Sequence, residues 1–243
     1  MKQINFLLLI NVFLFINNVC YSMDNIEYVN SMGFLNLTEE QLEEYPISAL
    51  EGDSLKASFL FDYYSLHNDD YEEGIYWTMI GAESGDKILE YNFAYILKDI
   101  YEDELRALFF FTKSAEKGSE AAGKALIQLQ NDFNKRGYIF PKEKDLPLEI
   151  NKNNVKLFSD IAKLGSQKAA KKLVEYYKRE TSLCNRDKKI DRIEDEKSFI
   201  YWLRIGAQNN SKECMIEYAT LLKQSSDKLD NIRSKFWIKK ASK

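Results

Sequence analysis

Hydrophobic residues recur at helical spacing along this chain, and one short polar motif separates the helices that they predict. After Gly85, for example, Leu89, Phe93 and Leu97 stand four positions apart, as the buried face of an amphipathic helix requires. The motif is alanine, two further residues, glycine or asparagine, and then aspartate or serine. It begins at Ala49, Ala82, Ala115, Ala162 and Ala207, and a further copy starts at Ala241.

The motif has the chemistry of a turn between two helices. Glycine tolerates the left-handed backbone that ends a helix, and the following aspartate or serine can cap the next helix. The steps between the alanines are 33, 33, 47, 45 and 34 residues, a period typical of helical-hairpin repeats. The sequence therefore predicts an all-α fold, an α/α superhelical solenoid of about five helical hairpins with a short N-terminal helix.

Further patterns refine this prediction at the start of the chain and inside each hairpin. Thr38 and Gln41 have the spacing of a capping box, and Pro46 is expected to end the short helix that follows. A large residue stands five positions before every motif alanine after Ala49, which predicts packing of large side chains against small ones. These expected core residues are Trp77, Phe110, Leu157, Trp202 and Phe236.

The two longer steps indicate insertions, one near residues 131–154 and one near residues 181–196. Insertions in a solenoid map to loops along one edge, which is often functional. Tolerated loop length is the alternative, and the sequence leaves both open.

The residues around the second and third turns resemble the Sel-one-like repeat (SLR), a relative of the tetratricopeptide repeat. Its pattern is carried by Asp70–Trp77, Gly81–Asp86, Leu89–Leu97 and Ala115–Ser119. Later copies depart from it, with Leu157, Cys214 and Asn210 in place of an aromatic, an alanine and a glycine. The resemblance covers residues 49–243 and implies a scaffold that binds proteins.

The first 22 residues are typical of a secretory signal peptide cut after Ser22. Lys2 precedes an apolar run over residues 6–16, interrupted by Asn11, and small residues stand near the cut. An uncleaved anchor or a lipid on Cys20 are the alternatives. The expected domains are a signal peptide (1–22), a capping segment (23–48) and the repeat solenoid (49–243), with the mature chain exported, periplasmic or secreted and without a membrane span.

Charge and side-chain chemistry exclude several function classes. The formal net charge is −4, and removing Lys2 with the signal peptide makes it −5, which disfavours nucleic-acid binding. The single histidine, His67, and two dispersed cysteines provide no metal ligand set and no catalytic triad, so we expect no enzyme and no cofactor. Cys184 and Cys214 could form a disulfide in an exported protein, or remain buried thiols.

A partner is expected on the concave face, which the first helix of each hairpin lines. Tyr91 and Tyr95 would be exposed aromatics there, and the lysines would form a basic stripe able to steer an acidic partner. The residues predicted on this face are Tyr91, Tyr95, Lys98, Lys124, Ile127, Gln130, Lys168, Lys171, Val174, Lys178, Glu213, Ile216, Thr220 and Lys223.

Three function hypotheses remain, and the resemblance implies the first two. The leading one is an exported repeat protein that binds another protein, in its sharpest version an immunity protein that neutralises a toxic effector in the periplasm, such as a lipase delivered by type VI secretion. The second is a general cell-envelope scaffold or host-interaction factor with several partners. The third, a hydrolase, would require carboxylates that converge in a pocket.

Overall fold

The computed structural model describes residues 36–67, 70–183 and 189–243, and across these ranges it contains helices and turns but no strand. The chain divides into two compact bodies, which we call the N-terminal body (described residues up to 139) and the C-terminal body (described residues from 140). The predicted signal peptide and the first half of the predicted capping segment lie outside the described residues.

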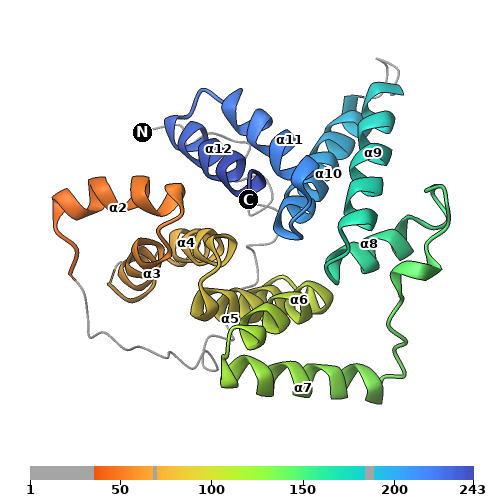
Figure 1. The fold of residues 1–243 in the computed structure, drawn as a ribbon, viewed down its shortest axis with the longest axis horizontal. Helices are drawn as coiled ribbons and strands as arrows, with labels where there is room; N and C mark the ends of the chain where they lie inside the picture. Colours follow the sequence, from red (N-terminus) through yellow and green to blue (C-terminus); the bar gives the residue numbers. More distant parts are fainter. Residues whose placement is uncertain (1–35, 68–69, 184–188) are drawn as a thin grey trace. The chain divides into compact units, whose positions relative to one another are not determined.

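The N-terminal body contains six α-helices, coloured from orange to green in Figure 1. Short π-helical turns extend α3 and α5, and helices adjacent in sequence pack against each other. The helices are α2 (Glu39–Glu51), α3 (Ser54–Asp62), α4 (Tyr71–Ser84), α5 (Lys87–Tyr95), α6 (Glu104–Glu116) and α7 (Glu120–Lys135).

The C-terminal body contains the remaining helices, in which α9 packs on α10 and α11 on α12. Its core includes Leu173, Leu203 and Trp237, none of which is exposed. The helices are α8 (Val155–Lys163), α9 (Gln167–Leu183), α10 (Lys189–Gln208), α11 (Lys212–Lys223) and α12 (Lys228–Ala241). The predicted all-α fold built from helical hairpins is confirmed.

All five complete copies of the repeated motif form the same turn. The fourth residue of each copy has a positive φ, between 66° at Asn210 and 111° at Gly165. The fifth residue closes the turn with a backbone hydrogen bond to the residue before the motif alanine, as from Asp86 N to Gly81 O at 3.1 Å. Its side chain then caps the next helix. The caps are Asp53, Asp86, Ser119, Ser166 and Ser211.

The start of the N-terminal body confirms one local prediction and corrects another. Thr38 and Gln41 form the predicted capping box. The expectation that Pro46 ends the helix is wrong, because Pro46 lies inside α2 and the helix continues to the turn at Gly52. A proline inside a helix loses one backbone hydrogen bond, and here the burial of Tyr45, Ala49 and Leu50 holds the helix together.

Three of the five large residues predicted in the core are buried, and the other two are not fully buried. Trp77, Phe110 and Trp202 are at most 6% exposed. Leu157 and Phe236 are only partly buried, and in α12 the fully buried aromatic is Trp237.

The two insertions have different structures. The first is an irregular segment between α7 and α8 that contains a short 3-10 turn, Glu143–Asp145. The second was expected as a loop, which is wrong for most of its length, because α9 extends to Leu183 and α10 begins at Lys189. Its lysine, arginine and glutamate residues are good helix formers.

Candidate protein-binding surface

The five helix caps give equivalent starting points from which residues of the helix after each turn can be numbered. Counted from the cap, the residues at positions two, five, nine and twelve lie on one stripe, which we call the repeat row. On α9 and α11 every residue of this row is exposed. The residues are Lys168, Lys171, Glu175 and Lys178 on α9, and Glu213, Ile216, Thr220 and Lys223 on α11.

The rows of α9 and α11 lie side by side, because two ion pairs join the helices. Lys171 Nζ lies 3.2 Å from Glu213 Oε1, and Lys178 Nζ lies 2.5 Å from Glu217 Oε1. The hydrogen bond to Glu213 raises the pKa of Lys171. We call this surface the α9–α11 face.

The α9–α11 face contains one exposed apolar side chain, Ile216. Ile216 is 49% exposed and lies along α11 between Glu213 and Glu217, the two acceptors of the ion pairs. An exposed isoleucine flanked by two ion pairs matches the pattern of protein interfaces, in which an apolar anchor has a polar rim. The sequence row contained Ile216 and Glu213, but it did not reveal that Glu213 and Glu217 pair with Lys171 and Lys178.

The structure shifts the sequence-predicted row by one residue on α9. Val174 is 4% exposed and belongs to the core, so its placement on the exposed face is wrong. Glu175 occupies the exposed position instead. The face is therefore a mixture of both charges rather than a purely basic stripe.

In the N-terminal body the expectation of two exposed tyrosines on α5 is corrected. Tyr91 is 5% exposed, and its ring packs 5.0 Å from the Tyr95 ring and 5.9 Å from the Phe111 ring. Tyr95 is partly buried, and Lys98 is partly exposed and bound to Asp99 at 2.6 Å. The Phe111 ring on α6 packs against both tyrosine rings, and Tyr91 is a core residue.

The other predicted residues fall in several environments. Lys124 and Gln130 on α7 are exposed, as is Ile127 at 61%. They lie in the other body from the α9–α11 face, which brings together four of the predicted lysines, Lys168, Lys171, Lys178 and Lys223. Whether a partner binds any of these residues remains a prediction.

Cys214 is buried, and Cys184 lies outside the described residues, so their pairing stays a prediction. His67 ends the π-helical turn that follows α3. Two of the acidic residues near helix starts cap their helices, because Asp70 accepts from Glu73 N and Asp103 from Arg106 N.

Within the described ranges, no group of three or more histidine, cysteine, aspartate or glutamate side chains is arranged to hold a metal ion. None of the described helices is both long and apolar enough to cross a bilayer.

No family model matches the chain, and no curated protein matches it. The chain is similar to the crystal structure of a protective antigen present in uropathogenic Escherichia coli strains, which displays an SLR fold. The identity is 25% and the TM-score 0.34, and the match covers 81% of this chain and 39% of that one. This chain thus spans about two fifths of that protein's length.

Proposed function

We propose that this chain is a protein-binding repeat protein and that a partner docks on the α9–α11 face. The observation that carries the proposal is Ile216, an isoleucine 49% exposed between two ion pairs that hold their side chains in place. Ordered charges around an exposed apolar anchor reduce the entropy cost of docking and exclude water from the anchor.

The charges on this face favour a partner with acidic groups. Lys171 and Lys178 are already paired with glutamates of α11. Lys168 and Lys223 are exposed, and within the described part of the chain neither takes part in an ion pair. Acidic side chains at the rim of the partner would be attracted to these two lysines. This attraction would increase the association rate at low salt.

A finer proposal concerns the identity of the partner. The family resemblance noted in the sequence suggests an exported immunity protein, whose partner would be a toxic effector, with a type VI secretion lipase as one version. The alternative is an envelope scaffold or host-interaction factor. In either case the chain acts by binding rather than by catalysis, and its export depends on the predicted signal peptide.

Affinity capture with a matched pair of variants tests the docking surface. The bait is the predicted mature chain, residues 23–243, incubated with lysate of the source cells and read by mass spectrometry. Ile216→Glu places a charge on the proposed anchor. Ile238→Glu makes the same change on α12, where the isoleucine is 48% exposed. We expect Ile216→Glu to lose the captured partner by at least about tenfold and Ile238→Glu to retain it.

Equal capture by both variants would contradict the assignment of the α9–α11 face. Circular dichroism of each bait checks that the helices remain. One stoichiometric partner with a catalytic domain that the chain inhibits would support the immunity role. Several weaker partners would support the scaffold role, and hydrolytic activity of the purified chain would contradict both.

A second pair of variants tests the charge argument. Lys168→Glu reverses a row residue that has no ion pair to lose, whereas Lys239→Glu reverses an exposed lysine on α12. We expect Lys168→Glu to weaken capture and to make it less dependent on salt, and Lys239→Glu to change neither. An unchanged affinity for Lys168→Glu would show that the partner is not acidic.

A further inference from the structure

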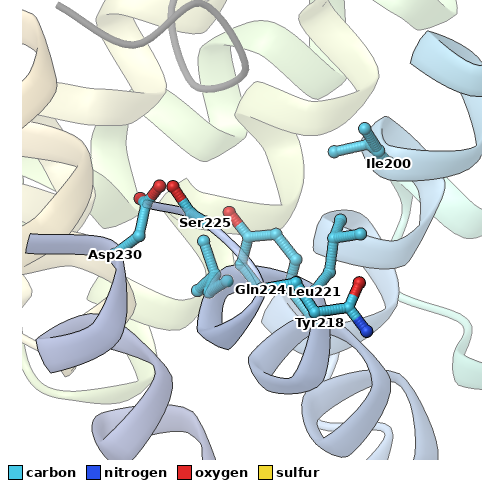
Figure 2. A pocket seen from close by; sticks show the side chains of 7 residues that line it. Ile200, Tyr218, Leu221, Gln224, Ser225 and Asp230 are labelled. Carbon is cyan, nitrogen blue, oxygen red and sulfur yellow. The ribbon is translucent and has the colours of Figure 1, made fainter. Parts of the chain in front are cut away.

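A second surface feature of the C-terminal body is a hollow of about 260 Å³ between α10, α11 and α12. Figure 2 shows side chains from these helices around it. Its walls are largely apolar, formed by Ile200 of α10 and by Leu221, Leu222 and the Tyr218 ring of α11. Gln224, Ser225 and Asp230 also line it.

The oxygen atoms in the hollow gather at one end. In Figure 2 the Asp230 carboxylate and the Ser225 hydroxyl lie next to each other, and the Tyr218 hydroxyl points toward the same end. Asp230 is only 6% exposed and accepts a hydrogen bond from the Ser225 hydroxyl. The hollow therefore combines an apolar wall with a polar end that contains a carboxylate.

Asp230 has no cation to balance its charge within the described part of the chain. A second carboxylate, Asp227 at the start of the same helix, repels the negative charge of Asp230. Burial raises the pKa of Asp230, and the Asp227 charge acts in the same direction. Burying a carboxylate costs free energy unless a partner or a helix terminus compensates its charge. Its position in the first turn of α12 gives partial compensation through the helix dipole.

We propose that this hollow receives a lysine side chain of a protein partner. The four-carbon stem of lysine would lie along Ile200, Leu221 and Leu222, and its ammonium group would meet Asp230. An ammonium group has three donors on one nitrogen, which suits the oxygens of Asp230, Ser225 and Tyr218 gathered at one point. A planar guanidinium would require acceptors spread along a fork. That the lysine belongs to a protein rests on the proposed function.

The test uses N-acetyl-lysine N-methylamide as the probe. The comparison compounds are the same derivatives of norleucine and arginine, and 1,4-diaminobutane. Binding is followed in the full chain by the methyl NMR signals of Ile200, Leu221 and Leu222. We expect the lysine compound to bind with a Kd on the order of 1 mM, because so small a ligand makes few contacts. The norleucine compound keeps the stem and loses the charge, and should bind at least about tenfold more weakly.

Asp230→Asn is the central variant and Asp227→Asn its matched control. Both remove one negative charge from the start of α12, and at the cap position 227 asparagine caps a helix as well as aspartate does. Asp230→Asn should weaken lysine binding at least about tenfold, and Asp227→Asn should change it less than twofold. Ser225→Ala, which keeps the carboxylate, should have an intermediate effect and serves if Asp230→Asn unfolds.

Several outcomes would overturn the inference. Equal binding of the lysine and norleucine compounds, or equal effects of the two asparagine variants, would show that Asp230 is only a charge in the first turn of α12 and does not bind the ammonium group. Tighter binding of the arginine compound or of diaminobutane would assign the hollow to a different ligand. Ile216→Glu should leave lysine binding unchanged, so the hollow can fail while the docking face stands, and the docking face can fail while the hollow stands.

Discussion

Leu89 packs directly against Gly81, so closely that a Cβ atom at position 81 would lie 1.9 Å from Leu89 Cδ1. Gly206 and Cys214, also eight residues apart, repeat this contact in the C-terminal body, where a Cβ at 206 would lie 2.4 Å from Cys214 Sγ. The two helices on either side of a turn therefore meet at a residue without a side chain. This contact explains why a small residue precedes the motif alanine at both positions.

Gly81→Ala should destabilise the N-terminal body by about 1–3 kcal/mol, because Leu89 is fully buried and has no free space to move into. Urea unfolding followed by circular dichroism measures this. Gly123→Ala is the matched control, since that glycine lies inside α7 with nothing within 4 Å of a new Cβ. The control should gain up to about 1 kcal/mol from helix propensity. The same gain for Gly81→Ala would contradict the packing described.

Glu90→Gln should destabilise the N-terminal body by about 3 kcal/mol. Glu90 is fully buried on α5, and its Oε1 lies 3.1 Å from Lys113 Nζ and 2.6 Å from Lys117 Nζ. Burial lowers the pKa of Lys113 in spite of Glu90, so removing the carboxylate leaves an ammonium group with poor solvation and no counter-charge. Urea unfolding at neutral pH gives the value.

Two comparisons separate this buried pair from a surface effect. Glu104→Gln breaks the more exposed pair with Arg136, whose atoms lie 2.8 Å apart, and should cost less than about 1 kcal/mol. Adding Lys113→Met to Glu90→Gln should recover part of the loss, because it removes the stranded charge. Equal costs for Glu90→Gln and Glu104→Gln would show that burial does not matter here.

The sequence predicted the turns far better than the exposed surface, and the reason is physical. A turn depends on a few adjacent residues, so the glycine, asparagine, aspartate and serine positions were sufficient to locate all five. Exposure depends on a neighbouring helix that the local pattern does not contain. Tyr91 is buried because Phe111 of the next helix packs against it, and no spacing within α5 reveals that contact.

The candidate sites show the same division. Lys168, Lys171 and Lys178 were predicted on one face and are exposed together, but their charge balance depends on Glu213 and Glu217 from another helix. The hollow at Asp230 was not predicted at all, because its walls come from three helices. An aspartate three positions after a helix cap reads as an ordinary first-turn charge, and only its burial distinguishes it.

The stability difference between Asp230→Asn and the natural chain should depend on pH. Because burial raises the pKa of Asp230 above its ordinary value of 3.8, the folded chain holds that proton more tightly than the unfolded chain. The stability contributed by the protonated group is present below pH 3.8 and is lost as pH rises through the folded pKa. Asparagine cannot ionise, so the variant should gain stability relative to the natural chain as pH rises above 3.8 and through the raised pKa of Asp230.

Urea unfolding at several pH values measures this difference. Asp227→Asn, measured alongside, reports the general effect of removing one carboxylate from the same turn. A difference for Asp230→Asn that is constant with pH, or that moves against the variant as pH rises, would show that burial does not raise this pKa.

Cys214 should react slowly with iodoacetamide in the folded chain. It is 2% exposed, and burial raises the pKa of its thiol, so little reactive thiolate is present near neutral pH. The measurement uses a chain with Cys20→Ser and Cys184→Ser, read by mass spectrometry with and without urea. Labelling at the same rate in both conditions would contradict the burial. Non-reducing mass spectrometry of the natural chain tests the predicted pairing with Cys184.

Hydrogen exchange of the complex tests most directly whether the α9–α11 face is the docking surface. The captured partner is mixed with the chain, and amide exchange is followed by mass spectrometry with and without it. A partner that binds the folded chain at this face should slow exchange in peptides from α9 and α11, because local opening would then require its release. Slowed exchange confined to other helices, with α9 and α11 unchanged, would contradict the account.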